Sequence, residues 1–248
     1  MTISGKSALI TGSATGIGLA IAEVLASNGV NLVLHGLPEQ SVKTTALAEA
    51  MGAAGSIHVD LRTVNGVNQV VQQCEVLLPG GVDILILNAA LERRASWDQL
   101  SRGDAELQLA VNLLAPLGLT QKLATGMRDR GWGRVLFVGS VQQIRPHPQL
   151  IAYAAAKAAV ENIARNLAVQ LGGFGVTVNT LSPGAIETDM NRAVLSDPEY
   201  RTAVTSRIPA GRLGTPAECA AAALFFCSDA AAYVNGANLF VDGGMGVR

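Results

Sequence analysis

A short apolar run that ends in a cluster of glycines constrains the fold of this chain more than any other feature. Residues 7–11 predict a buried strand, Gly12, Gly16 and Gly18 follow it, and residues 19–28 have the periodicity of a helix. A strand, a glycine-rich turn and a helix in this order can cradle the pyrophosphate of a dinucleotide, because the helix begins with free backbone N–H groups. The start of the chain therefore predicts a dinucleotide-binding α/β fold.

The three glycines have separate tasks in such a turn. Gly12 permits the tight turn, Gly16 lets the backbone approach the phosphates, and Gly18 lets the helix pack closely on the sheet. Their spacing, G-x-x-x-G-x-G, differs from the more familiar G-x-G-x-x-G. Glycine clusters also form ordinary turns, so it is the position directly after the first predicted strand that favours the functional interpretation.

Apolar runs and helical segments alternate along the rest of the chain, which has no internal repeat, linker or low-complexity segment. The predicted strands are residues 7–11, 30–35, 56–59, 82–87, 134–140, 176–181 and 239–241. This alternation predicts an α/β doubly wound sheet of about seven parallel strands with helices on both faces. We expect a single domain over residues 1–248, in which the more polar segment 185–208 forms a lid over the substrate.

The composition argues against several classes of function. The formal net charge is −1 and there is no run of basic residues, so neither a nucleic-acid partner nor a membrane partner is expected. No apolar stretch reaches the ~18 residues that span a bilayer, and the N-terminus has no signal-peptide pattern. Cys74, Cys219 and Cys227 are scattered without metal-ligand spacing, which predicts free thiols, no metal site and a cytoplasmic setting.

Tyr153 and Lys157 are the strongest candidates for chemistry. A spacing of four residues on the predicted helix 151–171 places both side chains on one face, one turn apart. A tyrosine hydroxyl has a pKa near ~10, and a neighbouring ammonium group favours the phenolate and lowers this pKa. Ser140 ends the predicted strand 134–140, where its hydroxyl could hold a carbonyl or alcohol oxygen beside Tyr153. Taken alone, the pair could equally be an ordinary contact on a helix.

The end of the second predicted strand favours NAD over NADP as the cofactor. An acidic residue at this point bonds the 2′-hydroxyl of the adenosine ribose, whereas a basic residue pairs with a 2′-phosphate. The chain has His35 and Gly36 here and no lysine or arginine before Lys43, so a 2′-phosphate would find no fixed cation. We expect His35 to pack at the strand end. Asp60, after the third strand, could accept the adenine amino group or cap a helix.

Two polar segments are candidates for the substrate rim. Glu92, Arg93 and Arg94 follow the fourth predicted strand, in what could also be a solvated loop. An irregular segment with two prolines lies between the proposed serine and tyrosine. Its polar side chains are Gln142, Gln143, Arg145 and His147. These residues favour a polyhydroxyl or anionic small-molecule substrate, and we expect His147 to lie at the exposed rim.

Taken together, these motifs resemble the short-chain dehydrogenase/reductase family along essentially the whole chain. The matching residues are Thr11–Gly18, Asp60-Leu61, Asn88-Ala89, Asn112, Ser140, Tyr153, Lys157, Pro183-Gly184 and Thr188. In this resemblance Tyr153 exchanges the proton with a substrate oxygen that Ser140 orients. Lys157 bonds the nicotinamide ribose and lowers the pKa of Tyr153, and Asn112 anchors a water of the proton relay. The cofactor contacts expected from the motifs are Gly12, Thr15, Gly16, Ile17, Gly18, Gly36, Asp60, Leu61, Asn88, Tyr153, Lys157, Pro183, Gly184, Ile186 and Thr188.

The chain departs from the family pattern at the end of the fourth predicted strand. The family commonly has Asn-Asn-Ala-Gly there, and this chain has Leu87-Asn-Ala-Ala90. This strand end backs the adenosine half of the cofactor, so the departures bear on cofactor affinity or backbone geometry and leave the four catalytic candidates intact.

Resemblance within the family implies hydride transfer between a nicotinamide and a secondary alcohol or ketone. Residues 207–212 and 233–236 are similar to sugar-acid and polyol dehydrogenases. Residues 31–36 are similar to 3-hydroxybutyrate dehydrogenases, but Gln142 and Leu150 replace the histidine and lysine of that group, so this substrate is not favoured.

Other interpretations of the chain stay open at this point. An NADPH-dependent 3-oxoacyl-thioester reductase would want a basic surface, for which Arg128 and Arg130 are candidates, and a basic ribose site, which is missing. A non-catalytic dinucleotide-binding protein is a remote alternative, because none of the four catalytic candidates is lost. Members of the family are usually homotetramers, so the resemblance also implies a homo-oligomer.

Overall fold

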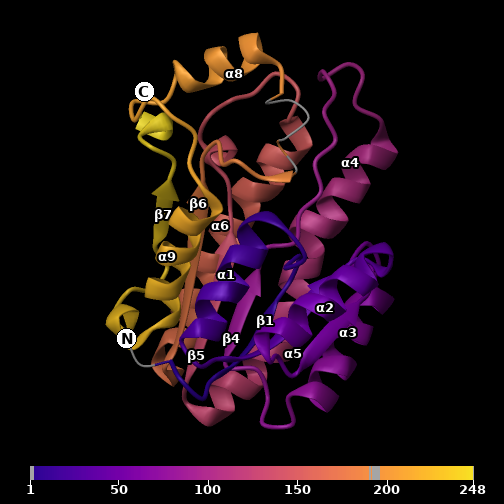
Figure 1. Cartoon of the computed structure of the whole chain (residues 1–248), viewed down its shortest axis with the longest axis vertical. Helices are drawn as coiled ribbons and strands as arrows, with labels where there is room; N and C mark the ends of the chain where they lie inside the picture. The colour runs from indigo at the N-terminus through magenta and orange to yellow at the C-terminus, as the bar shows by residue number, and fades with distance from the viewer. Residues whose placement is uncertain (1–2, 190, 192–195, 248) are drawn as a thin grey trace.

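The computed structural model describes residues 3–189, 191 and 196–247 and contains one sheet of seven parallel strands (Figure 1). The strands are β1 (Ser7–Ile10), β2 (Asn31–Gly36), β3 (Gly55–His58), β4 (Ile84–Leu87), β5 (Gly133–Val138), β6 (Val176–Pro183) and β7 (Asn238–Val241). Their order is β3-β2-β1-β4-β5-β6-β7, and each neighbouring pair is parallel. The predicted doubly wound α/β fold is confirmed.

Two layers of helices cover the sheet. One layer has α1 (Gly16–Ser27), α2 (Ser41–Met51) and α9 (Pro216–Cys227), and Figure 1 shows α1 and α9 in front of the strands. The other layer has α3 (Val64–Leu77), α5 (Ala115–Arg130) and α6 (Ile151–Leu171). Successive side chains of a strand point to opposite faces. In β1, Ala8 and Ile10 therefore pack in the first layer and Leu9 in the second.

The remaining elements are short. They are α4 (Arg102–Leu109), α8 (Pro198–Thr205), a π-helical turn (Ala110–Leu114) and the 3-10 turns Pro38–Gln40, Val141–Gln143, Gly172–Phe174, Asp229–Ala231 and Met245–Val247. Figure 1 shows α8 at the top of the molecule, above the carboxyl ends of the strands. The strand order reverses between β1 and β4, and the crevice at such a reversal is where doubly wound sheets bind their ligands.

Most predicted elements agree with the structure to within a few residues. The helix predicted over 151–171 has these bounds, whereas α1 begins three residues earlier than predicted, at Gly16. Asn112 lies in the π-helical turn, which joins α4 to α5. The predicted lid 185–208 contains α8, and its residues 190 and 192–195 lie outside the described part of the chain.

Three properties of the described residues bear on membranes, metal ions and thiol chemistry. None of the helices in the described ranges is long and apolar enough to cross a membrane. In those same ranges, no group of three or more His, Cys, Asp or Glu side chains is placed to hold a metal ion. Cys74, Cys219 and Cys227 are buried free thiols.

Candidate active site

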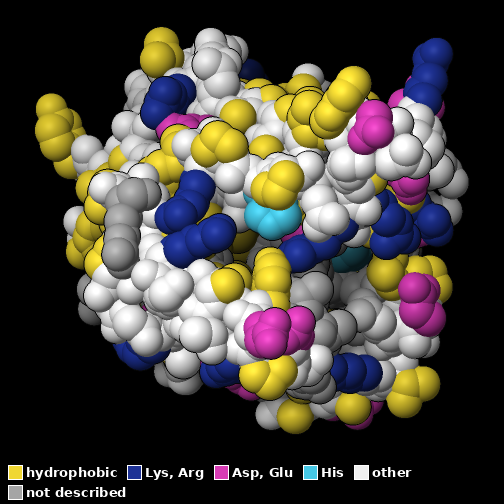
Figure 2. Space-filling view, turned by 90° about the horizontal axis from the view of Figure 1, so that it is seen from above, with side chains coloured by type: hydrophobic (Ala, Val, Ile, Leu, Met, Phe, Trp, Pro, Cys, Tyr) yellow, Lys and Arg dark blue, Asp and Glu magenta, His cyan; other side chains and the backbone are white. Residues whose placement is uncertain are grey.

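A cleft of about 810 Å³ opens at the carboxyl ends of the strands and joins the glycine turn to the Tyr153 segment. Figure 2 looks onto this end of the molecule and shows basic side chains gathered around a hollow. The predicted site residues that line the cleft are Gly12, Thr15, Gly16, Ile17, Gly36, Asp60, Leu61, Asn88, Arg93, Ser140, Gln142, Arg145, His147, Tyr153, Lys157, Pro183, Gly184, Ile186 and Thr188. Gly18 and Asn112 lie behind its wall.

The glycine turn is fastened to the end of β4 by Thr11 and Asn88. The Thr11 hydroxyl accepts hydrogen bonds from the backbone N–H groups of Asn88 and Ala89, both at 3.0 Å. The Asn88 amide donates to the carbonyl oxygens of Thr11 at 3.0 Å and Gly12 at 2.9 Å. A Cβ atom at Gly18 would overlap the Gly12 carbonyl oxygen and the Asn88 amide nitrogen. Gly18 thus allows the close packing on which the shape of the turn depends.

His35 is a structural link beneath the glycine turn. Its Nδ1 accepts a hydrogen bond from the Gly12 N–H at 3.2 Å, and its Nε2 lies 2.9 Å from the carbonyl oxygen of Val59. This pairing requires the neutral ring with its proton on Nε2. Burial lowers the pKa of His35 to about 4, which keeps the ring neutral. The predicted packing role of His35 is confirmed, with the addition that it joins β1, β2 and the end of β3.

The adenosine end of the cleft contains charged groups that the sequence analysis missed. Glu39 and Arg62 line it together with Asp60, and Arg62 pairs with the Asp60 carboxylate. The Asp60 carboxylate also accepts the Arg62 backbone N–H at 2.9 Å. Arg62 follows the third strand, whereas the sequence analysis searched for a cation only at the end of the second strand. The end of β2 itself offers Gly36 and Leu37, without a cation.

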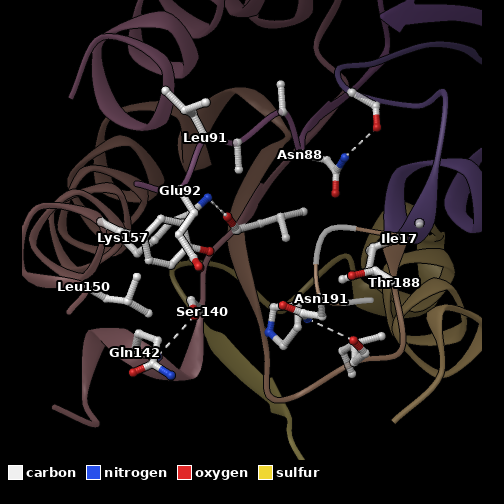
Figure 3. Close-up of a pocket in the computed structure, with 18 of the residues that line it drawn as sticks. Ile17, Asn88, Leu91, Glu92, Ser140, Gln142, Leu150, Lys157, Thr188 and Asn191 are labelled. Carbon is white, nitrogen blue, oxygen red and sulfur yellow. Dashed lines mark hydrogen bonds between the residues drawn. The ribbon is translucent and has the colours of Figure 1, made fainter. Parts of the chain in front are cut away.

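Ser140, Tyr153 and Lys157 converge on one wall of the cleft (Figure 3). The Ser140 hydroxyl oxygen accepts the Gln142 N–H at 3.2 Å, which leaves its own proton to be donated. Gln143 accepts the Ser140 N–H at 3.2 Å and donates to Glu161 on α6. Gln143 therefore fixes the backbone at Ser140 from outside the cleft. It does not line the cleft, so the predicted contact of Gln143 with the substrate is not found.

The pKa values of the catalytic pair differ from the sequence-based expectation. Burial and, to a smaller extent, the negative charge of Glu92 raise the pKa of Tyr153 to about 12, against the opposing effect of the hydrogen bond with Ser140. Burial lowers the pKa of Lys157 to about 8. The Lys157 Nζ donates to the Val138 carbonyl oxygen at 2.7 Å and lies 5.7 Å from the centre of the tyrosine ring, and burial is the largest influence on the pKa of Tyr153. In this state the protein favours the neutral tyrosine.

Asn112 occupies the π-helical turn and holds the backbone after β4. Its side-chain oxygen accepts the Leu91 N–H at 2.9 Å, and its amide nitrogen donates to the Leu91 carbonyl oxygen at 2.7 Å. Such turns within helices are frequent at functional sites. Leu91 lines the cleft, so Asn112 shapes the wall of the site through its neighbour.

The substrate half of the cleft, which contains Glu92, Arg94, His147 and Tyr200, is lined mainly by basic side chains. Arg94 donates through Nε to Glu92 at 2.6 Å and through Nη1 to the Tyr200 hydroxyl at 3.3 Å, which connects the loop after β4 to α8. Burial lowers the pKa of His147, and the positive charge of Arg94 lowers it further. The other arginines that line this half are Arg93, Arg145 and Arg207.

The departures at the end of β4 are accommodated without strain. Leu87 is buried in the core between β4 and the second helix layer. Ala90 lines the cleft, and none of the non-glycine residues in the described ranges has a positive φ, so the backbone at Ala90 does not require glycine.

The sheet order, the glycine turn and the Ser140–Tyr153–Lys157 group define an NAD(P)-dependent oxidoreductase. A family model described as enoyl-(acyl carrier protein) reductase matches residues 12–246, and the chain belongs to the short-chain dehydrogenase/reductase family.

Relatives within this family act on different substrates. The chain is 36% identical to gluconate 5-dehydrogenase of Gluconobacter oxydans, over 99% of this chain and 96% of that protein. It is also 36% identical to a 3-oxoacyl-[acyl-carrier-protein] reductase of Vibrio harveyi, over 99% of both chains. A gluconate 5-dehydrogenase of Burkholderia cenocepacia, solved with NADP and tartrate, superposes with a TM-score of 0.91 at 35% identity, over 99% of this chain and 97% of that chain.

Proposed function

We propose that this chain transfers a hydride between a nicotinamide dinucleotide and a hydroxyl-bearing carbon of a sugar acid or related polyol. The observation that carries the substrate class is the set of arginines around the substrate half of the cleft. A carboxylate is bound well by guanidinium groups, because their paired N–H donors match its two oxygens. A relative that is a gluconate 5-dehydrogenase, and a similar structure that holds tartrate, agree with this substrate class.

The residues of the cleft fit the cofactor. Gly16 has a φ of +56°, and a Cβ there would meet the Thr188 side chain at 3.3 Å, so the bare backbone is free to approach a pyrophosphate at the start of α1. When bound, the nicotinamide supplies the hydride donor or acceptor. Lys157 binds the ribose next to it, and Pro183, Gly184, Ile186 and Thr188 line the same part of the cleft.

The proton chemistry belongs to the side chains of the protein. Tyr153 gives its hydroxyl proton to the substrate oxygen during reduction of a ketone and takes it back during oxidation of the alcohol. Ser140 donates a hydrogen bond to the same oxygen and holds it beside Tyr153. Asn112 supports a proton relay by fixing the wall of the cleft at Leu91, the residue that its side chain holds.

We infer that NAD is preferred over NADP. No lysine or arginine stands at Gly36 or Leu37, and the Arg62 guanidinium is already paired with Asp60 close to Glu39. A 2′-phosphate would therefore enter a region with two carboxylates and one guanidinium, whereas a 2′-hydroxyl can donate to a carboxylate.

An NADPH-dependent 3-oxoacyl-thioester reductase is the second candidate. It is supported by the family-model description and by the 36% identity to the Vibrio harveyi reductase. The arginines of the substrate half oppose it, because a 3-oxoacyl thioester has no negative charge near the carbon that reacts.

We further propose that residues 1–248 act as one domain in a cytoplasmic homotetramer, with residues 185–208 as the lid. The buried free thiols suit a reducing compartment. The bridge from Arg94 to Tyr200 suits a lid that closes over the substrate. Sedimentation velocity of the purified chain measures the oligomer.

Initial rates of NADH and NADPH absorbance test the proposed function. The panel consists of aldonic acids, polyols, simple secondary alcohols and the matching ketones, with an acetoacetyl thioester as the competing substrate. We expect turnover of an aldonic acid with NAD. Turnover confined to the thioester with NADPH would establish the second candidate instead.

A further inference from the structure

The substrate half of the cleft contains a carboxylate that catalysis does not require. Of the described residues that line this half, Glu92 is the acidic one, and its side chain is 16% exposed. Glu92 lines the same cleft as Ser140, Tyr153 and Lys157 (Figure 3). Its charge also reaches the Tyr153 hydroxyl, whose pKa it raises. The carboxylate is therefore near the carbon at which the reaction occurs.

The two oxygens of Glu92 are in different situations. Oε1 accepts a hydrogen bond from Arg94 Nε at 2.6 Å, and Arg94 is itself held by the Tyr200 hydroxyl at 3.3 Å. Within residues 3–189, 191 and 196–247, no hydrogen-bond donor reaches Oε2. Arg94 thus fixes the orientation of the carboxylate and leaves one acceptor oxygen for a ligand.

A charged hydrogen-bond acceptor in a partly enclosed cleft favours substrates that carry a hydrogen-bond donor at the matching position. A substrate hydroxyl next to the reacting carbon can donate to a carboxylate oxygen, and hydrogen bonds to charged groups are stronger than neutral ones. The carbonyl oxygen of a thioester is an acceptor only, so it would face the carboxylate without a proton between them. A cleft with this arrangement favours hydroxylated substrates over acyl thioesters.

We propose that Glu92 is a specificity-determining residue whose free oxygen binds a substrate hydroxyl on the carbon beside the one that reacts. This rests on the proposed function and narrows it. The arginines bind the anionic end of the substrate, and Glu92 selects a vicinal hydroxyl at the reacting end. The preferred substrate is accordingly a sugar acid that reacts within its polyol segment, at a carbon with a hydroxylated neighbour.

The test compares acetoin with butanone, two ketones that differ by one hydroxyl on the carbon beside the carbonyl. The measured quantity is the ratio of their kcat/KM values in the full-length enzyme with its reduced cofactor. This ratio cancels any effect of a variant that is common to both ketones. An acetoacetyl thioester is the third probe. The variants are Glu92→Leu, which removes the acceptor, Glu92→Gln, which keeps a neutral acceptor, and the control Glu106→Gln, which removes a carboxylate that is 61% exposed on α4.

We expect the wild type and Glu106→Gln to prefer acetoin by roughly 10- to 100-fold, the range for a hydrogen bond to a charged group. Glu92→Leu should reduce the preference to within about threefold, with Glu92→Gln in between, and both variants should gain activity on the thioester relative to acetoin. An unchanged ratio in Glu92→Leu, or no preference in the wild type, would overturn the inference while leaving the proposed function intact. Failure of both ketones together with rapid thioester reduction would overturn both.

Discussion

The ε-ammonium group of Lys157 donates a hydrogen bond to the carbonyl oxygen of Val138 at 2.7 Å. Val138 is the last residue of β5, and Ser140 follows it two residues later. Lys157 lies one turn from Tyr153 on α6. This bond therefore connects the helix that carries the acid/base group to the strand end that carries the serine, and it holds a buried charge in place.

The buried charge of Lys157 should reduce the stability of the cofactor-free protein. Its pKa is lowered from 10.5 to about 8, so the folded state binds the proton less tightly than the unfolded state. The free energy of unfolding is therefore reduced by about 3 kcal/mol below pH 8, and this reduction disappears as the pH rises toward 10.5.

Lys157→Met should therefore abolish turnover and still raise the Tm at neutral pH. The variant removes the buried charge but also loses the hydrogen bond to Val138, and each kcal/mol of net gain in stability should raise the Tm by roughly 2–4 °C. Thermal unfolding at neutral and alkaline pH measures this, and the gain should shrink as the pH rises. A variant that melts below the wild type at neutral pH would show that the hydrogen bond outweighs the buried charge.

His35 should make the protein sensitive to acid. Its folded-state pKa is about 4 against an ordinary value of 6.5, so its contribution to stability is present above pH 6.5 and is lost as the pH falls toward 4. The loss amounts to about 3 kcal/mol. His35→Gln, which does not titrate there, should flatten the fall in the free energy of unfolding across this range. Urea unfolding at a series of pH values measures it, and parallel curves for variant and wild type would contradict the assignment.

Gly18 should tolerate no side chain, although it does not touch the cleft. The added methyl group of Gly18→Ala would overlap the Gly12 carbonyl oxygen and the Asn88 amide, and so displace the glycine turn. We expect cofactor affinity to fall by at least tenfold in calorimetry, because the turn holds the phosphates. Gly173→Ala is the matched control, since a Cβ at Gly173 would have no atom within 4 Å and its φ is ordinary. Equal Kd values for the two variants would rule out this role.

The cofactor preference should respond to a cation at Leu37. Gly36 is a poor site for such a change, because a Cβ there would lie 2.7 Å from the Thr44 hydroxyl oxygen. Leu37→Arg should shift the NADP/NAD ratio of kcat/KM toward NADP by about tenfold, the effect of one charge-assisted contact with a 2′-phosphate. Val42→Arg adds the same charge at an 85% exposed position outside the cleft and should leave the ratio unchanged. Equal shifts in both variants would mean that the ribose lies elsewhere.

The fold and the core of the site are predictable from local patterns. The strand–turn–helix unit at Gly12–Gly18 and the helix that carries Tyr153 and Lys157 follow from periodicity and spacing, which act over a few residues. The packing of His35 is predicted from its position at a strand end, whereas its neutral ring and its bonds to Gly12 and Val59 are seen only in the structure. For the strand–turn–helix unit and for the helix of Tyr153 and Lys157, the residues that decide the structure are close together in the sequence.

The missed features depend on contacts between distant segments. Arg62 reaches the adenosine end from the segment after β3. Glu92 was predicted as a rim residue, but its orientation was not, because it depends on Arg94, which Tyr200 holds from α8. Gln143 turns away from the cleft because Glu161 on α6 accepts its amide proton. The pKa of Tyr153 was also beyond a spacing argument, since burial and not the neighbouring lysine dominates it.

The most direct test of the account is the initial rate of NAD reduction by wild type and Tyr153→Phe with an aldonic acid, alongside calorimetric binding of NAD to both. Phenylalanine keeps the ring and removes the proton-transferring hydroxyl, and general acid–base catalysis contributes about 10²–10⁴-fold. We predict a fall in kcat of at least this size with the Kd for NAD changed by less than about threefold. Wild-type kcat in Tyr153→Phe would contradict the assignment of Tyr153 as the acid/base group.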